Sequence, residues 1–189
     1  VTGSGKTEVY LQIVSHELSA SRHCLILTPE IGLVPQLVDR FRKRFGSNVF
    51  EYHSNCSLQE RIKTWKRSLE TTTPSVFIGT RSAIFLPLSN LGLIVLDEEH
   101  DSSYKQESPM PCYHARDLAI HRAKKIGAKV ILGTATPSLN IWKNLKPNGN
   151  VVVAKLTQRI FNRKLPTVSV VDMREELAIG NRSLISRHL

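Results

Sequence analysis

The sequence predicts an α/β fold in which a mostly parallel sheet carries helices on both faces. Short apolar runs alternate with amphipathic stretches along the chain, as in parallel strands that are joined by helices. A Gly-Ser-Gly-Lys-Thr segment stands just ahead of the first amphipathic stretch, where a helix N-terminus can receive phosphate. The chain has 189 residues, of which 41% are hydrophobic, so it has room for one ordinary core and the beginning of a second domain.

Amphipathic stretches predict the helices. The first stretch, 6–19, places Tyr10, Ile13, Val14 and Leu18 on one face, and 35–45 points Leu37, Val38, Phe41 and Phe45 inward. The next helix follows a Ser57 cap, and we interpret its stripe of Leu58, Ile62, Trp65 and Leu69 as core. Two further helices are expected over 113–126 and, with Ser138 as its cap, over 138–145.

Apolar runs of strand length predict the sheet. The expected strands are 24–27, 49–52, 75–78, 91–96, 129–132 and 151–153. After Thr157 the chain becomes basic and irregular, with a short extended piece at 168–171 and a possible helix start at Ser183. We therefore expect a first unit over 1–158 and a connector over 159–189 that enters a truncated second lobe.

The charge balance favours a polyanionic partner. The net charge is +10, which suits nucleic acid first and an anionic membrane surface second, although an ordinary basic domain also fits. No apolar run approaches the roughly 18 residues of a membrane span, and no secretory leader begins the chain, so no membrane partner is expected. The three scattered cysteines form no C-x-x-C pair, which predicts neither a disulfide framework nor a zinc site and suits a reducing cytoplasm, with Cys24 in the core.

The opening segment predicts a phosphate-binding loop, since 2–7 fits all but the first residue of G-x-x-x-x-G-K-[ST]. Its glycines let backbone amides face the phosphates, Lys6 is a charge for the β- and γ-phosphates, and the Thr7 hydroxyl would ligate Mg²⁺ of bound ATP. The predicted nucleotide-binding residues are Thr2, Gly3, Ser4, Gly5, Lys6, Thr7 and Glu8. A Gly-Ser turn that merely caps a helix is the alternative.

An acidic cluster follows the buried run 91–96. Asp97 comes at the expected carboxyl edge of the sheet, where it would hold Mg²⁺, and Glu98 would act as the general base that orients water. Glu99 has no assigned role, and His100 would link the nucleotide site to a neighbouring loop. A solvated acidic strand end is the alternative, which the pairing with the phosphate-binding loop disfavours.

Other polar groups also follow predicted strands. Thr134 and Thr136 can bridge the acidic cluster and a ligand, although a Thr-Pro turn that caps the next helix explains them equally well. Thr80, Arg81 and Ser82 suit a nucleic-acid phosphate, with Pro29 and Glu30 on the same edge, but a lone arginine in a turn is often only solvated. The basic runs 40–44 and 61–67 are interpreted as solvated helix faces.

A loop rich in aromatic residues joins the acidic cluster to the following helix. Tyr104, Lys105 and Tyr113 lie in it, and such rings can stack on unpaired bases. We predict that this loop, with His100, Thr134 and Thr136, couples nucleic-acid binding to hydrolysis.

Taken in order, these segments resemble motifs I, Ia, Ib, II and III of superfamily 2 helicases. More narrowly, the chain resembles the PriA family of replication-restart helicases. The segments that carry this resemblance are Gly3-Ser4-Gly5-Lys6-Thr7-Glu8-Val9-Tyr10, Asp97-Glu98-Glu99-His100-Asp101, Ser103-Tyr104-Lys105-Gln106, Tyr113-His114-Ala115-Arg116-Asp117, Leu165-Pro166 and Val171-Asp172-Met173-Arg174.

The resemblance implies a RecA-like P-loop lobe, with its first strand truncated, from an ATP- and Mg²⁺-dependent 3′-to-5′ DNA helicase. Its partners would be single-stranded or forked DNA and the primosome proteins of replication restart, in the cytoplasm. Zinc would be held only by the second-lobe region outside this chain, and the arginine that completes the ATP site would also lie outside, so the isolated piece should have little activity. Here 107–112 lacks the arginine and tryptophan expected of the family. The alternatives are another superfamily 2 translocase, acting on RNA or duplex DNA, and a DNA-binding assembly module without turnover.

Overall fold

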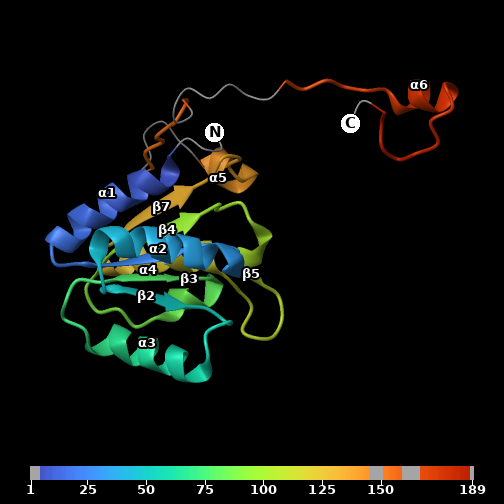
Figure 1. The fold of residues 1–189 in the computed structure, drawn as a ribbon. Coiled ribbons are helices and arrows are strands. Elements are labelled where there is room, and N and C mark those ends of the chain that lie inside the picture. The colour runs from blue at the N-terminus through green and yellow to red at the C-terminus, as the bar shows by residue number, and fades with distance from the viewer. Residues whose placement is uncertain (1–4, 145–150, 159–166, 188–189) are drawn as a thin grey trace.

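The computed structural model describes residues 5–144, 151–158 and 167–187. Within them, five parallel strands form one sheet in the order β2-β3-β1-β4-β7 (Figure 1). The strands are β1 (His23–Leu27), β2 (Val49–Tyr52), β3 (Val76–Gly79), β4 (Leu91–Asp97) and β7 (Lys129–Gly133). The predicted α/β fold with a parallel sheet is confirmed.

The register aligns the carboxyl ends of the strands along one edge of the sheet. Gly79 of β3 pairs with both Tyr52 of β2 and Leu27 of β1. Leu27 pairs in turn with Leu96 of β4, and Asp97 pairs with Gly133 of β7. The polar segments that follow these strands therefore start from a common edge, as the sequence predicted.

Helices connect the strands. They are α1 (Lys6–Ser19), α2 (Val34–Phe45), α3 (Leu58–Glu70), α4 (Ala115–Ile126), α5 (Leu139–Asn144) and α6 (Met173–Ala178), with short 3₁₀ turns η1 (Ile31–Leu33), η2 (Arg81–Phe85) and η3 (Ser102–Tyr104). A small hairpin pairs β5 (Lys105–Gln106) with β6 (Tyr113–His114). In Figure 1, α6 lies apart from the sheet. The division into 1–158 and 159–189 stays a prediction, and 159–166 lie outside the described residues.

Both faces of the sheet are buried, which explains why its strands are continuous apolar runs rather than alternating ones. Leu25 and Leu27 of β1 pack in one core with Ala119 of α4. Cys24 and Ile26 of the same strand face the opposite core, which contains side chains of α1 and α2. Burial raises the pKa of the Cys24 thiol to about 12, so this cysteine is an inert core residue as predicted.

The interpretation of the α3 stripe as core is wrong. Leu58, Ile62, Trp65 and Leu69 are 70%, 46%, 36% and 55% exposed. Only Ser68 of this helix is buried, and the Arg61 and Arg67 guanidinium groups lie over the rings of Tyr52 and Phe50 on edge strand β2. Of the stripe, Trp65 packs against the Tyr52 ring, with 6.3 Å between the ring centroids, and the two guanidinium groups cover the edge strand beside it. The predicted Ser57 cap is confirmed, since Ser57 and Glu60 form a capping box.

Three other expectations are wrong. The helix expected from 113 begins at Ala115, because Tyr113 and His114 pair with β5. The valines at 151–153 form no strand, since they find no pairing partner among the described residues and stay exposed. No helix starts at Ser183 within the described part, while α6 was not predicted. Ser138 stands directly before α5, in the predicted cap position, and its hydroxyl also donates to Glu99.

Candidate active site

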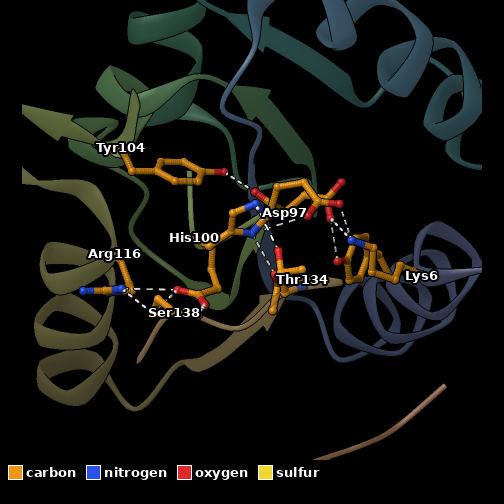
Figure 2. A network of polar contacts seen from close by, with 11 residues as sticks. Lys6, Asp97, His100, Tyr104, Arg116, Thr134 and Ser138 are labelled. Carbon is orange, nitrogen blue, oxygen red and sulfur yellow. Dashed lines mark hydrogen bonds and ion pairs between the residues drawn. The ribbon is translucent and has the colours of Figure 1, made fainter. Parts of the chain in front are cut away.

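The candidate site lies where α1 begins and β4 ends. Gly5 precedes α1 in the left-handed region, with φ 88°, a conformation that glycine adopts without steric cost. Lys6, the first residue of the helix, donates from Nζ to Glu98 Oε1, and its Nζ lies 3.6 Å from Asp97 Oδ1. Figure 2 shows Lys6 reaching toward Asp97. Residues 92 positions apart thus form one charged cluster.

Tyr10 fixes the Asp97 carboxylate from the next turn of α1. Its hydroxyl donates to Asp97 Oδ1 at 2.9 Å. Burial, followed by the nearby Asp97 charge, raises the pKa of Tyr10 well above its usual value, so the hydroxyl keeps its proton. This contact requires Gly133 on the neighbouring strand, because a Cβ at that position would collide with the Tyr10 ring. One oxygen of Asp97 is therefore held in place.

The backbone at Glu98 is strained. Its φ is +46°, which costs a residue with a Cβ on the order of 1 kcal/mol. Two main-chain bonds stabilise the turn: Asp101 N donates to Glu98 O at 2.9 Å, and Glu99 N donates to Gly133 O at 3.0 Å. The strain lies at the residue that sequence analysis assigns to water activation.

Glu99 belongs to a closed cluster on the side of α4. Its side chain is fully buried, and it accepts from Ser138 N at 2.8 Å, from Ser138 Oγ at 3.1 Å and from Arg116 Nη1 at 3.2 Å. Figure 2 shows the Arg116 and Ser138 contacts. With its oxygens satisfied by protein donors, Glu99 ties β4 to α4 and to the segment after β7.

His100 joins the acidic turn to the segment that follows β7. Its Nδ1 lies 2.8 Å from Thr134 Oγ1, and its Nε2 lies 3.4 Å from Thr136 Oγ1. The same Nδ1 is 3.7 Å from Glu98 Oε2. The structure therefore brings together His100, Thr134 and Thr136, three of the six residues predicted to couple nucleic-acid binding to hydrolysis, next to the predicted base.

Tyr104 sits beneath this edge of the sheet. Its side chain is fully buried, and its hydroxyl lies 2.7 Å from the main-chain oxygen of Asp97 and 2.9 Å from that of Leu27. Burial raises its pKa well above the usual tyrosine value, so it remains a donor. Tyr104 thus joins the ends of β1 and β4 instead of presenting a ring to bases.

The hairpin after Tyr104 is ordered by its own polar groups. Gln106 Nε2 donates to the main-chain oxygens of Pro109 at 2.8 Å and Pro111 at 3.0 Å. Lys105 is exposed and pairs with Glu107. Tyr113 is half-buried and packs edge-on against Phe85 at 4.9 Å. Of the predicted aromatic pair, Tyr104 is buried and Tyr113 is half-buried.

The remaining predicted residues are placed as follows. Thr2, Gly3 and Ser4 lie outside the described residues, while Thr7 is half-buried in the first turn of α1. Glu8 is exposed and accepts from Arg44 of α2 at 2.8 Å, which lowers the Glu8 pKa. Thr80 and Ser82 flank Arg81 half-buried, Pro29 O accepts from Ser103 Oγ, and Glu30 is exposed. The nucleic-acid role of this group stays a prediction.

Sequence reasoning missed Tyr10, Arg116 and Ser138. Tyr10 was assigned to the core, yet it stands four residues after Lys6 and hence on the same helix face, a signal that places both near one ligand. No comparable signal marks the Arg116 contact with Glu99, because that contact depends on how α4 packs.

The described residues hold no helix that is long and apolar enough to cross a membrane. They also contain no cluster of three or more histidine, cysteine or acidic side chains arranged to hold a metal ion by themselves.

The comparison with known families identifies the class. The profile of the DEAD/DEAH box helicases matches residues 1–144, and the chain belongs to this family. Within it, the predicted resemblance to PriA is confirmed. The chain is 53% identical to the replication restart protein PriA of Synechocystis sp. over 192 residues, which covers 100% of the chain and 23% of that protein. It is 48% identical to PriA of Bacillus subtilis, again over 100% of the chain and 23% of the relative.

The chain thus spans about a quarter of the length of these relatives. Solved structures support the fold. RecG bound to a three-way DNA junction superimposes with a TM-score of 0.55 at 23% identity, over 74% of this chain and 18% of RecG. The Hef helicase domain of Pyrococcus furiosus gives 0.52 at 27% identity, over 72% of this chain and 28% of that domain.

Proposed function

We propose that this chain is the ATP-binding lobe of a DNA helicase that acts in replication restart and moves 3′ to 5′ along one strand. The observation that carries the proposal is the cluster of Lys6, Asp97 and Glu98 between the start of α1 and the end of β4. A helix N-terminus with a lysine, facing two carboxylates at a strand end, suits a nucleoside triphosphate and its metal ion. The similarity to PriA proteins supports replication restart as the process.

The donor set fits Mg²⁺ carried by ATP. Magnesium prefers oxygen ligands and takes only one or two from protein beside the phosphates. The Thr7 hydroxyl and the Asp97 carboxylate would supply these, and Tyr10 orients that carboxylate. When bound, the ion would neutralise charge on the phosphates.

The chain's own residues then have distinct tasks. Lys6 would bind the β- and γ-phosphates, because it is a single ammonium charge at the start of a helix. Glu98 would accept a proton from the attacking water, with its orientation set by the strained turn and by His100 nearby. Thr2, Gly3, Ser4, Gly5 and Glu8 complete the proposed phosphate-binding segment.

The nucleic-acid track would cross the carboxyl ends of β1 and β3. Pro29, Glu30, Thr80, Arg81 and Ser82 follow these strands, with Lys105 and Tyr113 on the adjacent hairpin. The proposed partners are single-stranded or forked DNA and the primosome proteins, in the cytoplasm. Residues 1–158 would form the first lobe, and 159–189 would connect it to a second lobe that completes the ATP site.

Strand separation by the full-length protein tests this proposal. Forked DNA and duplexes with a 3′ or a 5′ overhang are incubated with and without ATP. We expect ATP-dependent separation of the fork and of the duplex whose loading strand requires 3′-to-5′ movement. ATP turnover that is stimulated by RNA but not by DNA would favour a different superfamily 2 translocase. DNA binding without ATP turnover would favour an assembly module. Either result would overturn the proposal.

A further inference from the structure

Arg81 does not point freely from its loop, as a simple phosphate contact would. Its Nη1 donates to the main-chain oxygen of Ser103 at 3.1 Å and to that of Lys105 at 2.8 Å. The guanidinium also lies 5.9 Å from the centroid of the Tyr113 ring. Arg81 therefore joins the end of β3 to the hairpin at the residues on both sides of Tyr104.

Tyr104 continues this line of contacts to the candidate active site. Its buried hydroxyl lies 2.7 Å from the main-chain oxygen of Asp97, the residue before the predicted base. It also lies 2.9 Å from the main-chain oxygen of Leu27, just before the predicted nucleic-acid segment at Pro29. Two hydrogen bonds, joined through the backbone and side chain of Tyr104, thus connect the Arg81 guanidinium to the backbone of Asp97.

Among the described residues, Nε and Nη2 of Arg81 have no hydrogen-bond partner, so they remain donors for a further one. Both of its contacts above use the two N–H groups of Nη1, while Nε and Nη2 form the other edge of the guanidinium. That edge matches two oxygens of a phosphate. The side chain is half-buried at the carboxyl edge of a chain with net charge +10, so a DNA strand can approach it.

We propose that Arg81 is a positioning residue that connects a DNA phosphate to Asp97 through the backbone around Tyr104. This inference rests on the proposed function and goes beyond it by assigning the path. A phosphate on the Nε/Nη2 edge fixes the guanidinium and with it the Ser103 and Lys105 oxygens.

A movement at Arg81 reaches Asp97 because Tyr104 cannot relax by itself. Its ring is enclosed in a close-packed core, so a displacement of the flanking backbone carries the hydroxyl with it. Catalytic carboxylates act only within about 0.5 Å of their productive position, so a small displacement is enough to change turnover. The path is a hydrogen-bonded network with a buried side chain at its centre, which makes it testable by double-mutant cycles.

The experiment measures ATP turnover of the full-length protein with and without a single-stranded DNA oligonucleotide at saturation. The variants are R81K, Y104F and the double variant. R81K keeps the positive charge but loses the planar set of N–H donors of the guanidinium, and Y104F removes only the hydroxyl. We expect the ratio of DNA-stimulated to unstimulated turnover to fall at least about fivefold in each single variant. The double variant should fall no further than the larger single effect.

Arg122 provides the matched control. Its guanidinium also donates to main-chain oxygens, those of Ile84 at 2.6 Å, Leu86 at 2.7 Å and Leu88 at 3.4 Å, and within the described part of the chain it forms no hydrogen bond to the backbone around Tyr104. R122K should keep the stimulation ratio of the parent protein. Thermal unfolding of every variant is recorded, and the nearly isosteric Y104F carries the test if R81K does not fold.

Three results would overturn the inference. In the first, R81K raises the DNA concentration for half-maximal turnover but keeps the ratio, so Arg81 only binds phosphate. In the second, the fold losses of the stimulation ratio in R81K and Y104F multiply in the double variant, which would mean that the two residues act independently. In the third, R122K loses the ratio as R81K does, so the effect is general loosening. A parent protein without any DNA stimulation would instead refute the proposed function itself.

Discussion

Three consecutive carboxylates at the end of β4 have two different environments. The side chains of Asp97 and Glu98 are 23% and 33% exposed, and they share one ammonium group, that of Lys6. The side chain of Glu99 is 0% exposed and is satisfied by Arg116 and Ser138. A fully buried carboxylate needs its partners in place because desolvation is expensive, whereas a half-exposed one can exchange a protein cation for a ligand. These three neighbouring acidic residues thus have two roles. Asp97 and Glu98 form an exchangeable pair, which can replace its contact with Lys6 by contact with a ligand, whereas Glu99 is a fixed structural link.

The largest predicted effect tests the exchangeable pair through its shared partner, Lys6. Lys6→Ala should reduce ATP turnover of the full-length protein at least about a hundredfold, because the phosphates lose a preorganised charge. Folding should persist, since the Lys6 side chain is partly exposed. Steady-state turnover at saturating ATP and DNA measures the effect. Lys124→Ala, at an exposed position of α4, is the control and should keep full turnover.

Unchanged turnover in Lys6→Ala would remove Lys6 from the site. Equal losses in both lysine variants would mean that net charge, rather than position, sets the rate.

The next largest effect tests the fixed structural link at Glu99. Arg116→Met should lower the free energy of unfolding by about 3 kcal/mol, because it leaves the Glu99 charge buried without its cation. Hydrogen exchange of the α4 amides measures this stability within the complete protein. Asp117→Asn is the matched control. Asp117 also accepts from Arg116, but its side chain is 66% exposed, so its loss should cost less than about 1 kcal/mol.

If Arg116→Met were no more destabilising than Asp117→Asn, Glu99 would not differ from its exposed neighbours, and the contrast between the two environments would fail.

The smallest effect is the pH dependence of stability at His114, which lies at the start of α4 next to the Arg116 partner of Glu99. His114 Nδ1 accepts from Arg116 N at the start of α4, and burial, followed by the Arg116 charge, lowers the pKa of His114. The folded state therefore holds this proton less tightly than the unfolded chain. Stability is full above about pH 6.5 and falls as the pH drops below that value toward the lower folded-state pKa.

His114→Asn keeps a side-chain cap without a titrating group. Thermal unfolding between about pH 7.5 and pH 5.5 should then depend less on pH than in the parent. An identical pH dependence in both proteins would show that His114 contributes nothing to it.

The sequence predicted most of the fold because buried strands and capped helices carry local signals. The runs 24–27 and 91–96 are apolar throughout since both faces of each strand are covered, and α1 begins and ends where its periodicity predicted. Stripe periodicity failed for α3, because periodicity shows that a helix has an apolar face but not which face meets the sheet. There the guanidinium groups of Arg61 and Arg67, with Trp65 as the contacting member of the stripe, cover the edge strand.

For the site, motif order allowed the prediction that Lys6 and Asp97 meet, since carboxyl ends of parallel strands share an edge. The partners of Glu99 could not be predicted. Arg116 and Ser138 are 17 and 39 residues away. The packing of α4 against β4 brings Arg116 into contact, and the pairing of β4 with β7 brings the segment of Ser138. Arg81 was predicted to contact a nucleic-acid phosphate, but its hydrogen bonds to the backbone of Ser103 and Lys105 depend on how the hairpin folds and could not be predicted.

The most direct test of the exchangeable site is Glu98→Gln in the full-length protein, with ATP binding and ATP hydrolysis measured separately. The amide keeps the shape of the side chain but cannot accept the proton from water, so hydrolysis should fall at least about a hundredfold while binding in the presence of Mg²⁺ stays near that of the parent. Hydrolysis at the parental rate, or a parallel loss of binding and hydrolysis, would contradict the assignment of Glu98 as the base beside Lys6 and Asp97.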